Sequence, residues 1–582
     1  MLSILTKANF DPFSLPLIIL LQPFSCLIVG LSKLHLIMYE QDSKHLLPEP
    51  LPQPDARRSL VYVPFLLALA LAAGVYFGSR MVVIPKGSQK ETVSRLNKLI
   101  NIIEDRYVDK VDRESLTENA MRDILLGLDP HSSYMSPDDA QKAHEELSGN
   151  FGGVGIQFLI FKDTLVVTHL IADGPSERAG IKKFDRIVDV DGHSMARKEI
   201  TTEDVFKRLR GEMGTKVKLK IKRQGEKKLI SFELERDAIP VSTVETAIMV
   251  EDGIGYIRLN QFGAQTHSDF LQAVHRLQKK GMTSLILDLR DNGGGYLKEA
   301  NLIADEFLES GQLIVYTEGE HSPKHTYKAT KKGRLEKTKV AVLINHNSAS
   351  ASEIVAGALQ DNDRGIIIGR RSFGKGLVQE EISPFDDGSS IRLTVARYYT
   401  PTGRSIQKPY GKGIDYEMEQ IERFERNEFF VPDSSIFVDS LKFTTAKGKV
   451  VYGGGGIMPD IFVPIDTTGR TNFYSNLLYQ RVIAEFAFDF VERYRQVLLR
   501  YTDASMFAGS FAVEEQVFRE LLNYAEKKGL RRYPGEAEHS RRLIQNQIKA
   551  EIARLVWNTD GYFAVLAKTD SDLLKALEVL KK

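Results

Sequence analysis

The stretch NHNSASASEIV, residues 345–355, decides how the chain is expected to fold. The apolar run 340–344 before it predicts a β-strand, and a helix is predicted to begin near Glu353. A second apolar run at 365–368 follows, so the order is strand, turn, helix and strand, as in the crossover unit of an α/β sheet. Ser350 therefore falls between the carboxyl end of a strand and the amino end of a helix, where free backbone N–H groups favour negative charge.

A serine nucleophile needs a base, and the segment FGKGLVQ at 373–379 offers Lys375 between two glycines. His346 is the only histidine in a convincing position nearby, and the Gly-x-Ser-x-Gly elbow of lipases is absent around Ser350. A lysine acts as a general base only where burial lowers its pKa from about 10.4. Gln379 lies four residues on and leaves from the same face, so its neutral amide could orient the amine. Each motif alone is common and would not decide a function.

Taken together, the two motifs resemble the C-terminal processing peptidases, also called tail-specific proteases, which use a Ser–Lys dyad. The resemblance implies that Ser350 is the nucleophile, Lys375 the general base and Gln379 the residue that positions the base. It also implies that the backbone N–H of Ala351 is one donor of the oxyanion hole. No cofactor is expected for this chemistry.

The second oxyanion donor that the resemblance implies belongs to a glycine loop. The apolar run 285–289 predicts a strand, and RDNGGG at 290–295 follows it and precedes a predicted helix. If the sheet is parallel, free N–H groups of this loop lie in the same layer as Ser350. The donor is Gly293 or Gly294, and the sequence does not choose between them. A tight turn alone would explain one or two glycines but less easily three.

Residues 150–237 resemble a PDZ domain. The most specific segments are GGVGIQF at 152–158, GPSERAGI at 174–181 and DRIVDVDG at 185–192. A PDZ domain binds the terminal carboxylate of a peptide on loop N–H groups and adds the peptide to its sheet as a strand. A predicted helix at 202–210 would form the other wall of the groove. The peptide-binding residues that the resemblance implies are Val154, Gly155, Ile156, Gln157 and Phe158.

Length and composition set the limits of the prediction. The chain has 582 residues, a formal net charge of +1 and a single cysteine, Cys26. Single hydrophobic cores rarely grow past about 250–300 residues, so several domains are expected. The charge gives no indication of a nucleic-acid partner, and one cysteine excludes an intramolecular disulfide. His321 and His325 flank Pro323 and lack a carboxylate-rich partner motif, so no metal site is expected.

The expected fold class is α/β and multidomain, with flanking helical regions, and the family resemblance implies a crotonase/ClpP-like core. LDPHSSY at 128–134 resembles the family's linker before the PDZ domain. The last helices could cap the core, support a dimer or hold a partner, and a cap is favoured. The expected segments are an N-terminal tail at 1–59, a transmembrane anchor at 60–79, a helical region at 88–149, a PDZ domain at 150–237, a Ser–Lys protease core at 238–467 and a helical region at 468–582.

The anchor is predicted from the uncharged apolar stretch 60–78. At 1.5 Å per residue it would span roughly 28 Å, close to the thickness of the hydrocarbon layer. Arg57 and Arg58 precede it, which predicts a single pass through a bacterial inner membrane with the catalytic part on the periplasmic or extracellular side. A buried core helix is the alternative. An earlier apolar stretch at 15–31 is marginal, and Met38 would also suit as the first residue.

The expected function is that of a membrane-anchored serine endopeptidase that recognises protein C-termini. Its partners would be protein substrates with accessible C-terminal tails, while an adaptor and a homodimer are left open. Two alternatives come from other classes of protein. A crotonase-like acyl enzyme would need neither a peptide-binding domain nor a Ser–Lys pair, and a non-proteolytic PDZ scaffold would be expected to have lost Ser350 or Lys375.

Overall fold

The computed structural model of the chain describes residues 68–72, 87–432 and 438–582. Of the predicted anchor at 60–79, only 68–72 belongs to the described residues, and this piece is helical. The predicted tail at 1–59 lies outside them. Within the described parts of the chain, every helix is too short or too polar to cross a bilayer.

The described chain divides into two compact units, a first that ends at Ile124 and a second that begins at Leu125. Besides the helical piece 68–72, the described part of the first unit consists of two helices. They are α2 (Gly87–Arg106) and α3 (Arg113–Leu126). Leu125 and Leu126, at the end of α3, belong to the second unit. Arg113 of α3 donates to Asn101 Oδ1 of α2 at 2.8 Å, which ties the two helices together.

Residues 150–237 contain an antiparallel sheet with two short helices, α5 (Pro175–Arg178) and α6 (Thr202–Leu209). The spatial order of its strands is β3-β4-β5-β7-β8, with β6 beside β5. The strands are β3 (Ile156–Phe161), β4 (Thr164–Leu170), β5 (Arg186–Val190), β6 (His193–Ser194), β7 (Lys216–Lys222) and β8 (Ile230–Glu235). In β7, Val217, Leu219 and Ile221 are buried and the lysines between them are exposed, which is the period of two that forms a strand. Among the described strands, β3 has a neighbour on one side only.

The core sheet has six strands in the order β10-β11-β12-β15-β16-β21. They are β10 (Val244–Glu251), β11 (Ile254–Leu259), β12 (Ser284–Asp288), β15 (Lys339–Ile344), β16 (Ile366–Gly369) and β21 (Ile461–Phe462). All neighbours except β10 and β11 pair in parallel. Every residue of β12 is buried, because a parallel sheet is covered on both faces and its strands are continuous apolar runs.

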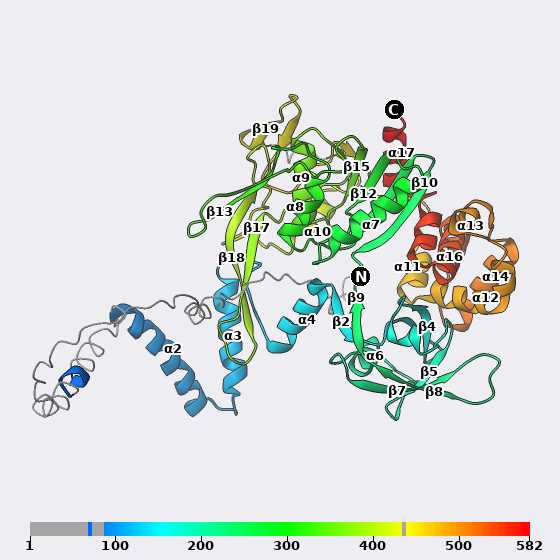
Figure 1. Cartoon of the computed structure of the whole chain (residues 1–582), viewed down its shortest axis with the longest axis horizontal. Coiled ribbons are helices and arrows are strands. Elements are labelled where there is room, and N and C mark those ends of the chain that lie inside the picture. The colour runs from blue at the N-terminus through cyan, green and yellow to red at the C-terminus, as the bar shows by residue number, and fades with distance from the viewer. Residues whose placement is uncertain (1–67, 73–86, 433–437) are drawn as a thin grey trace, which may run out of the picture. The chain divides into compact units, whose positions relative to one another are not determined.

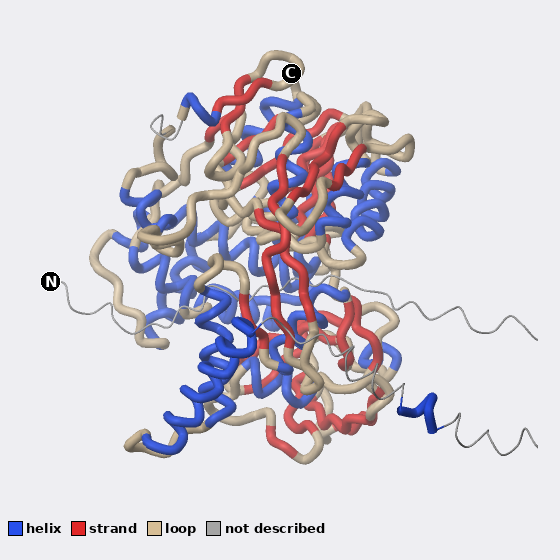
Figure 2. Tube along the Cα trace, turned by 90° about the vertical axis from the view of Figure 1, so that its left-hand side faces the viewer, coloured by secondary structure: helices blue, strands red, loops and turns tan. Residues whose placement is uncertain are grey.

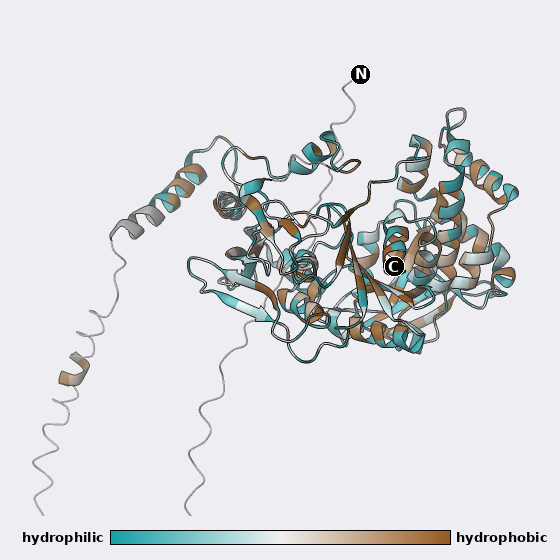
Figure 3. Cartoon of the chain, turned by 90° about the horizontal axis from the view of Figure 1, so that it is seen from above, coloured by the Kyte–Doolittle hydropathy of each residue, from teal (hydrophilic) through white to brown (hydrophobic). Residues whose placement is uncertain are grey.

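Helices cover both faces of the core sheet. On one face lie α7 (Thr266–Lys279), α8 (Leu297–Asp305) and α9 (Ala351–Asp361). On the opposite face lies α17 (Ser571–Leu580), beside β12 and β15 (Figure 1). Successive residues of β12 alternate between these faces, so Leu287 packs with the first set of helices while Ile286 packs with α17. Hydrophobic residues run along the strands of the core sheet, whereas the helices carry both kinds of residue (Figure 3).

A second sheet completes the core, in the order β1-β18-β13-β14 with β17 beside β18. Its strands are β1 (Ser133–Met135), β13 (Leu313–Glu318), β14 (His325–Lys328), β17 (Leu377–Ile382) and β18 (Ser390–Tyr399). The remaining elements are α4 (Pro137–Ser148), the pair β2 (Asn150–Gly153) and β9 (Asp237–Pro240), α10 (Glu419–Glu425), a 3₁₀ turn at Asp439–Leu441, and the pair β19 (Lys442–Thr444) and β20 (Val450–Tyr452). The unit from residue 125 onward thus combines helices and strands, which confirms the α/β class (Figure 2).

The C-terminal helices pack on the sheet of 150–237 as well as on the core. They are α11 (Asn472–Tyr479), α12 (Val482–Leu498), α13 (Ala504–Ser510), α14 (Glu515–Lys527), α15 (Glu536–His539) and α16 (Arg541–Leu566). Phe488 of α12 is fully buried, with its ring centroid 4.7 Å from that of Phe161 in β3. Beside it, Arg186 of β5 pairs with Glu492 at 3.0 Å. Hydrophobic and ionic contacts together therefore join these helices to the sheet.

Candidate active site

Ser350 lies at the turn between β15 and α9, as the sequence predicts. Its backbone has φ 55° and ψ −113°, a conformation that a residue with a side chain adopts only when its surroundings impose it. The Ser350 N–H donates to Glu353 Oε2 at 2.8 Å, within the first turn of α9. The turn thus presents the Ser350 side chain at the amino end of the helix.

The three serines of the turn are not equivalent. The Ser348 hydroxyl donates to the carbonyl of Leu289 at 2.7 Å, and the Ser352 hydroxyl donates to the carbonyl of Asn292 at 2.9 Å. Both side chains are fully buried, and their bonds tie the turn to the strand and loop that carry the three glycines. Ser350 instead lines a small pocket, so the middle serine is the one placed to meet a substrate.

Glu353 holds the two motifs of the site together. It is fully buried, and its carboxylate accepts hydrogen bonds from the backbone N–H groups of Ser350 (2.8 Å), Gly374 (2.8 Å) and Lys375 (2.9 Å) and from the Ser372 hydroxyl (2.5 Å). Burial raises the pKa of Glu353 to about 7, while these hydrogen bonds act in the opposite direction. Glu353 was not predicted from the sequence as a residue of the site, although a carboxylate three residues after a helix N-cap is a recognisable signal.

Lys375 and Gln379 interact as the sequence predicts. The Lys375 Nζ donates to Gln379 Oε1 at 3.0 Å, and Gln379 is 1% exposed. The pKa of Lys375 is lowered to about 8, mainly by burial and also by Arg392, whereas Asp129 and Glu353 act in the opposite direction. A minor fraction of this amine is therefore neutral at pH 7, and the neutral fraction rises toward pH 8.

Ser350 and Lys375 share two partners, although they are far apart in the sequence. One is Glu353, whose Oε2 accepts from both of their N–H groups. The other is the Tyr398 hydroxyl, which lies within hydrogen-bonding distance of the carbonyls of Lys375 and Ser350, the latter at 3.2 Å. The backbones of the two residues are therefore held close to each other from two sides.

The glycine loop lies directly against Ser350. A Cβ on Gly294 would come within 2.7 Å of Ser350 Cβ and 3.0 Å of the Ala351 nitrogen, and Gly294 has φ +108°, so only glycine fits there. The Gly294 N–H donates to Asn292 Oδ1 at 2.9 Å. The N–H groups of Ala351 and Gly293 have no acceptor among the described residues. Of the two glycines predicted as donors, Gly293 is thus the one whose N–H is uncommitted.

The segment 128–134, predicted as a linker, contributes buried polar groups to the site. Strand β1 pairs with β18, which brings Asp129 and His131 close enough to Lys375 to affect its electrostatics. Asp129 accepts from the Ser132 hydroxyl at 2.6 Å. The pKa of His131 is lowered to about 3, mainly by burial and also by the nearby Lys375, so His131 is neutral at physiological pH. In the sequence, the contribution of this segment to the site could have been recognised from the run of polar residues that follows an amphipathic helix.

The five residues predicted to bind a peptide lie together at the start of β3, and they are Val154, Gly155, Ile156, Gln157 and Phe158. The Val154 carbonyl accepts from the Ser176 N–H at 3.0 Å, and the Gly155 carbonyl accepts from the Ile171 N–H at 3.0 Å. The Phe158 ring faces Phe206 of α6, with centroids 5.7 Å apart. An open strand edge and an apolar surface shared with α6 therefore lie side by side.

Four family profiles match consecutive parts of the chain. "Peptidase family S41" matches residues 253–419, and "PDZ domain" matches residues 152–234. "Activating protease CtpB N-terminal domain" matches 81–139, and "Family of unknown function (DUF8443)" matches 473–558. The first two profiles cover the core and the sheet at 150–237 that carry the features described above.

The Carboxy-terminal-processing protease of Bartonella bacilliformis is 40% identical over 362 residues, which cover 60% of this chain and 81% of that protein. The chain belongs to the carboxy-terminal processing protease family. The Carboxy-terminal processing protease CtpB of Bacillus subtilis is 34% identical over 359 residues, which cover 59% of this chain and 73% of that protein. This confirms the resemblance stated from the sequence, and the chain is a serine peptidase with a PDZ domain.

The pocket beside Ser350 in this processing protease is narrow, with a volume of about 20 Å³. A volume of this size holds about one water molecule. Most of its lining is apolar, with Leu297, Ile354, Leu377 and Val378 among the residues that form it. The space next to the serine of the processing protease thus suits a small apolar group.

Proposed function

We propose that this chain is a membrane-anchored endopeptidase that binds protein C-termini with its PDZ domain and cleaves peptide bonds with a Ser350–Lys375 dyad. The observation that supports the dyad most strongly is the attachment of both backbones to Glu353 and to Tyr398. The pKa of Lys375, lowered to about 8, supports its role as the base.

In the proposed reaction, Ser350 Oγ attacks the carbonyl carbon of the scissile bond while its proton passes to the neutral Lys375 Nζ. The negative oxygen that forms accepts hydrogen bonds from the N–H of Ala351 and from one glycine of the loop, Gly293 being favoured over Gly294. The leaving amine then takes the proton from Lys375, and water hydrolyses the acyl-enzyme with Lys375 again as base. Gln379 aims the amine by accepting one of its hydrogen bonds.

The proposed substrates are proteins with accessible C-terminal tails. The open edge of β3 and the apolar surface between Phe158 and Phe206 support the addition of a terminal peptide as a strand. The small apolar pocket beside Ser350 supports cleavage next to a small apolar residue. An adaptor or regulator and a homodimer stay open under this proposal.

The proposed core is of the crotonase/ClpP-like type. A largely parallel sheet, with Ser350 after one strand and the glycine loop after its neighbour, supports this assignment. Membrane anchoring rests on the uncharged stretch 60–78, and the location on the periplasmic or extracellular side of a bacterial inner membrane rests on the arginines before it.

The test of the dyad uses residues 81–582 and an unstructured polypeptide that ends in apolar residues. The parent is compared with Ser350→Ala, Lys375→Ala and, as a matched control, Lys412→Ala at an exposed lysine. Cleavage by the parent and the control only is expected, with products identified by mass spectrometry. Equal cleavage by all four proteins would reject the mechanism.

Two further measurements test the other parts of the proposal. Amidation of the substrate's C-terminus should raise KM several-fold, because the PDZ domain loses the carboxylate that it binds; an unchanged KM would contradict C-terminal recognition. Deletion of residues 60–79 should move the protein from the membrane fraction to the soluble fraction of cells, and an unchanged distribution would contradict the anchor.

A further inference from the structure

Helix α17 lies outside the ranges of the four family profiles, yet it is part of the core. Its residues Leu573 and Leu577 are buried against Ile286 and Leu343 of the core sheet. The helix begins after Asp570, whose side chain accepts from the Leu573 N–H at 3.0 Å. The first turn of α17 therefore stands at the carboxyl ends of the parallel strands, where the proposed catalytic loops begin.

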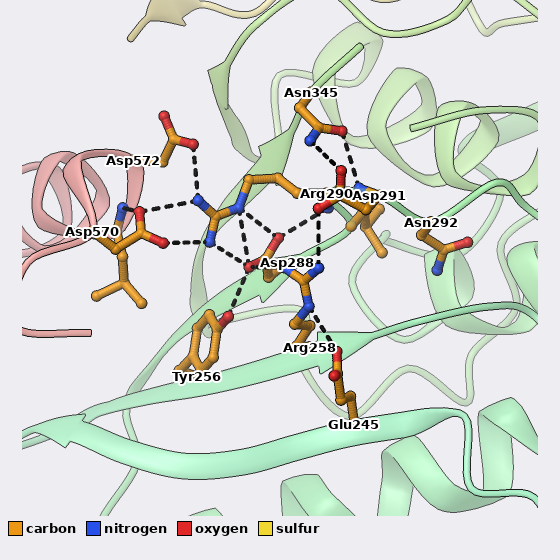
Figure 4. Close-up of polar contacts among 12 residues, drawn as sticks. Glu245, Tyr256, Arg258, Asp288, Arg290, Asp291, Asn292, Asn345, Asp570 and Asp572 are labelled. Atoms are coloured by element: carbon orange, nitrogen blue, oxygen red, sulfur yellow. Dashed lines mark hydrogen bonds and ion pairs between the residues drawn. The ribbon is translucent and has the colours of Figure 1, made fainter. Parts of the chain in front are cut away.

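A single carboxylate in this turn binds two arginines. Asp572, which is 2% exposed, accepts from Arg290 at 2.8 Å and from both terminal nitrogens of Arg370 at 2.9 and 2.8 Å. Asp570 adds a second contact to Arg290 at 2.8 Å, and Asp288 at the end of β12 binds the opposite side of the same guanidinium (Figure 4).

Each of these arginines stands at the start of a loop of the proposed site. Arg290 precedes the glycine loop 291–295, and Arg370 follows β16 and precedes Lys375 by five residues. Between β12 and β16 lies β15, which leads to Ser350. The Asp572 carboxylate thus binds one arginine after each of the two strands that flank β15. It thereby connects the loops on both sides of Ser350.

The two arginines depend on Asp572 to different degrees. Arg290 also pairs with Asp288 and Asp570. For Arg370, Asp572 is the only carboxylate within ion-pair distance among the described residues, and its other acceptor is the Val463 carbonyl at 2.8 Å. Removal of one partner leaves a buried charge uncompensated, so a neutral residue at 572 would force Arg370 to move or to draw in water.

We propose that Asp572 is a positioning residue. It holds the glycine loop 291–295 and the loop that carries Lys375 in fixed positions on either side of Ser350. This inference rests on the proposed function, because it takes Lys375 and the glycine loop as parts of one site. A misplacement of about 1 Å in such a site can lower the rate about 100-fold. Asp572→Asn is therefore expected to lower kcat about 10- to 100-fold and to change KM less than about twofold.

The experiment compares the parent, Asp572→Asn, Leu577→Ala and Ser350→Ala, all as residues 81–582. Leu577→Ala is the matched control, since it loosens the same helix against the same sheet and keeps the carboxylate of Asp572 that pairs with both arginines. The readouts are the melting temperature, kcat and KM on a cleavable peptide, and the affinity of a peptide aldehyde. Ser350 Oγ adds to the aldehyde carbon and its proton ends on the former carbonyl oxygen, which places that oxygen at the oxyanion site.

Asp572→Asn should lose kcat and aldehyde affinity together, while Leu577→Ala loses thermal stability but keeps both. Equal kcat for the two variants at equal melting temperature would overturn the inference. If Asp572→Asn does not fold, Arg370→Lys, which keeps the charge but loses the second donor, takes its place with the same expected loss of kcat alone. Cleavage by Ser350→Ala would instead reject the proposed function, so the two failures are distinguishable.

Discussion

At the scale of single residues, two buried titratable groups define the chemistry of the site. Lys375 carries an amine whose pKa is lowered to about 8, and Glu353 carries a carboxyl whose pKa is raised to about 7, in each case mainly by burial. The Lys375 amine donates to Gln379, whereas the Glu353 carboxylate accepts hydrogen bonds from backbone N–H groups. The first group is available for proton transfer, and the second holds the backbone.

The pH dependence of cleavage follows from Lys375. If Lys375 is the base, as proposed, it works only when neutral, so kcat/KM should rise with pH and reach half of its maximum near pH 8, the pKa of Lys375. Initial rates on one peptide between pH 6 and 10 measure this. A rate that falls across this range would exclude a lysine base, and circular dichroism at each pH serves as the control for folding.

Replacement of Glu353 by Gln should damage both rate and stability. The amide keeps one acceptor oxygen where the carboxylate has two, so at least one of the N–H groups of Ser350, Gly374 and Lys375 loses its acceptor. An unsatisfied buried donor costs about 1–3 kcal/mol, and we expect kcat to fall about 100-fold. Urea denaturation and steady-state kinetics test this, and wild-type values for both would show that the carboxylate does not hold the loops.

At the scale of elements, the two candidate sites use strand ends and strand edges in different ways. The core places its groups on loops at the carboxyl ends of parallel strands, where three loops converge beside α9. The PDZ domain instead offers the side of β3, because β3 ends its sheet. A peptide could therefore add to one sheet while its upstream part reaches the loops of another.

Phe158 allows the role of the β3 edge to be separated from catalysis. Its ring faces Phe206 of α6 in the proposed groove, and Phe158→Ala removes that apolar surface. KM should rise about 10-fold for a peptide with a free C-terminus, with kcat unchanged. The same peptide with an amidated end is the control, because the variant and the parent should then differ little. An equal loss on both peptides would contradict a role in C-terminal recognition.

At the scale of the whole chain from residue 125 onward, the C-terminal helices act as a support for two other parts. The helices α12 and α16 share a hydrophobic core with Phe161 and Val166 of the PDZ domain, while α17 covers one face of the core sheet. From the sequence, a cap on the core was favoured for the helices of 468–582 as a group; the contact of α12 and α16 with the PDZ domain was not predicted.

Truncation after Asp466 should therefore yield an insoluble or aggregated protein. It uncovers apolar residues of the core sheet such as Ile286, Ala341, Leu343 and Ile368, which are fully buried, and it leaves Arg290 and Arg370 without Asp572. Soluble yield, size-exclusion profile and binding of a hydrophobic dye measure the outcome. A soluble, active product that lacks residues 467–582 would show that the core is self-sufficient.

Local patterns of sequence were enough to predict the turn that carries Ser350, the continuous apolar strands of the core and the family of the chain. Each of these depends on residues a few positions apart, because the period of a strand or helix and the geometry of a turn are local properties. The pairing of Lys375 with Gln379 belongs to the same class, since the two are four residues apart.

Only the tertiary structure decided which groups surround those residues. It showed Glu353 and Tyr398 as partners shared by Ser350 and Lys375, His131 and Asp129 near the amine, and the Gly294 N–H already bound to Asn292. It also joined Asp572 to Arg370 across 202 residues and to Arg290 across 282 residues. The physical reason is that contacts of buried polar groups are set by the packing of whole sheets and helices against each other, and spacing along the chain carries no record of that packing.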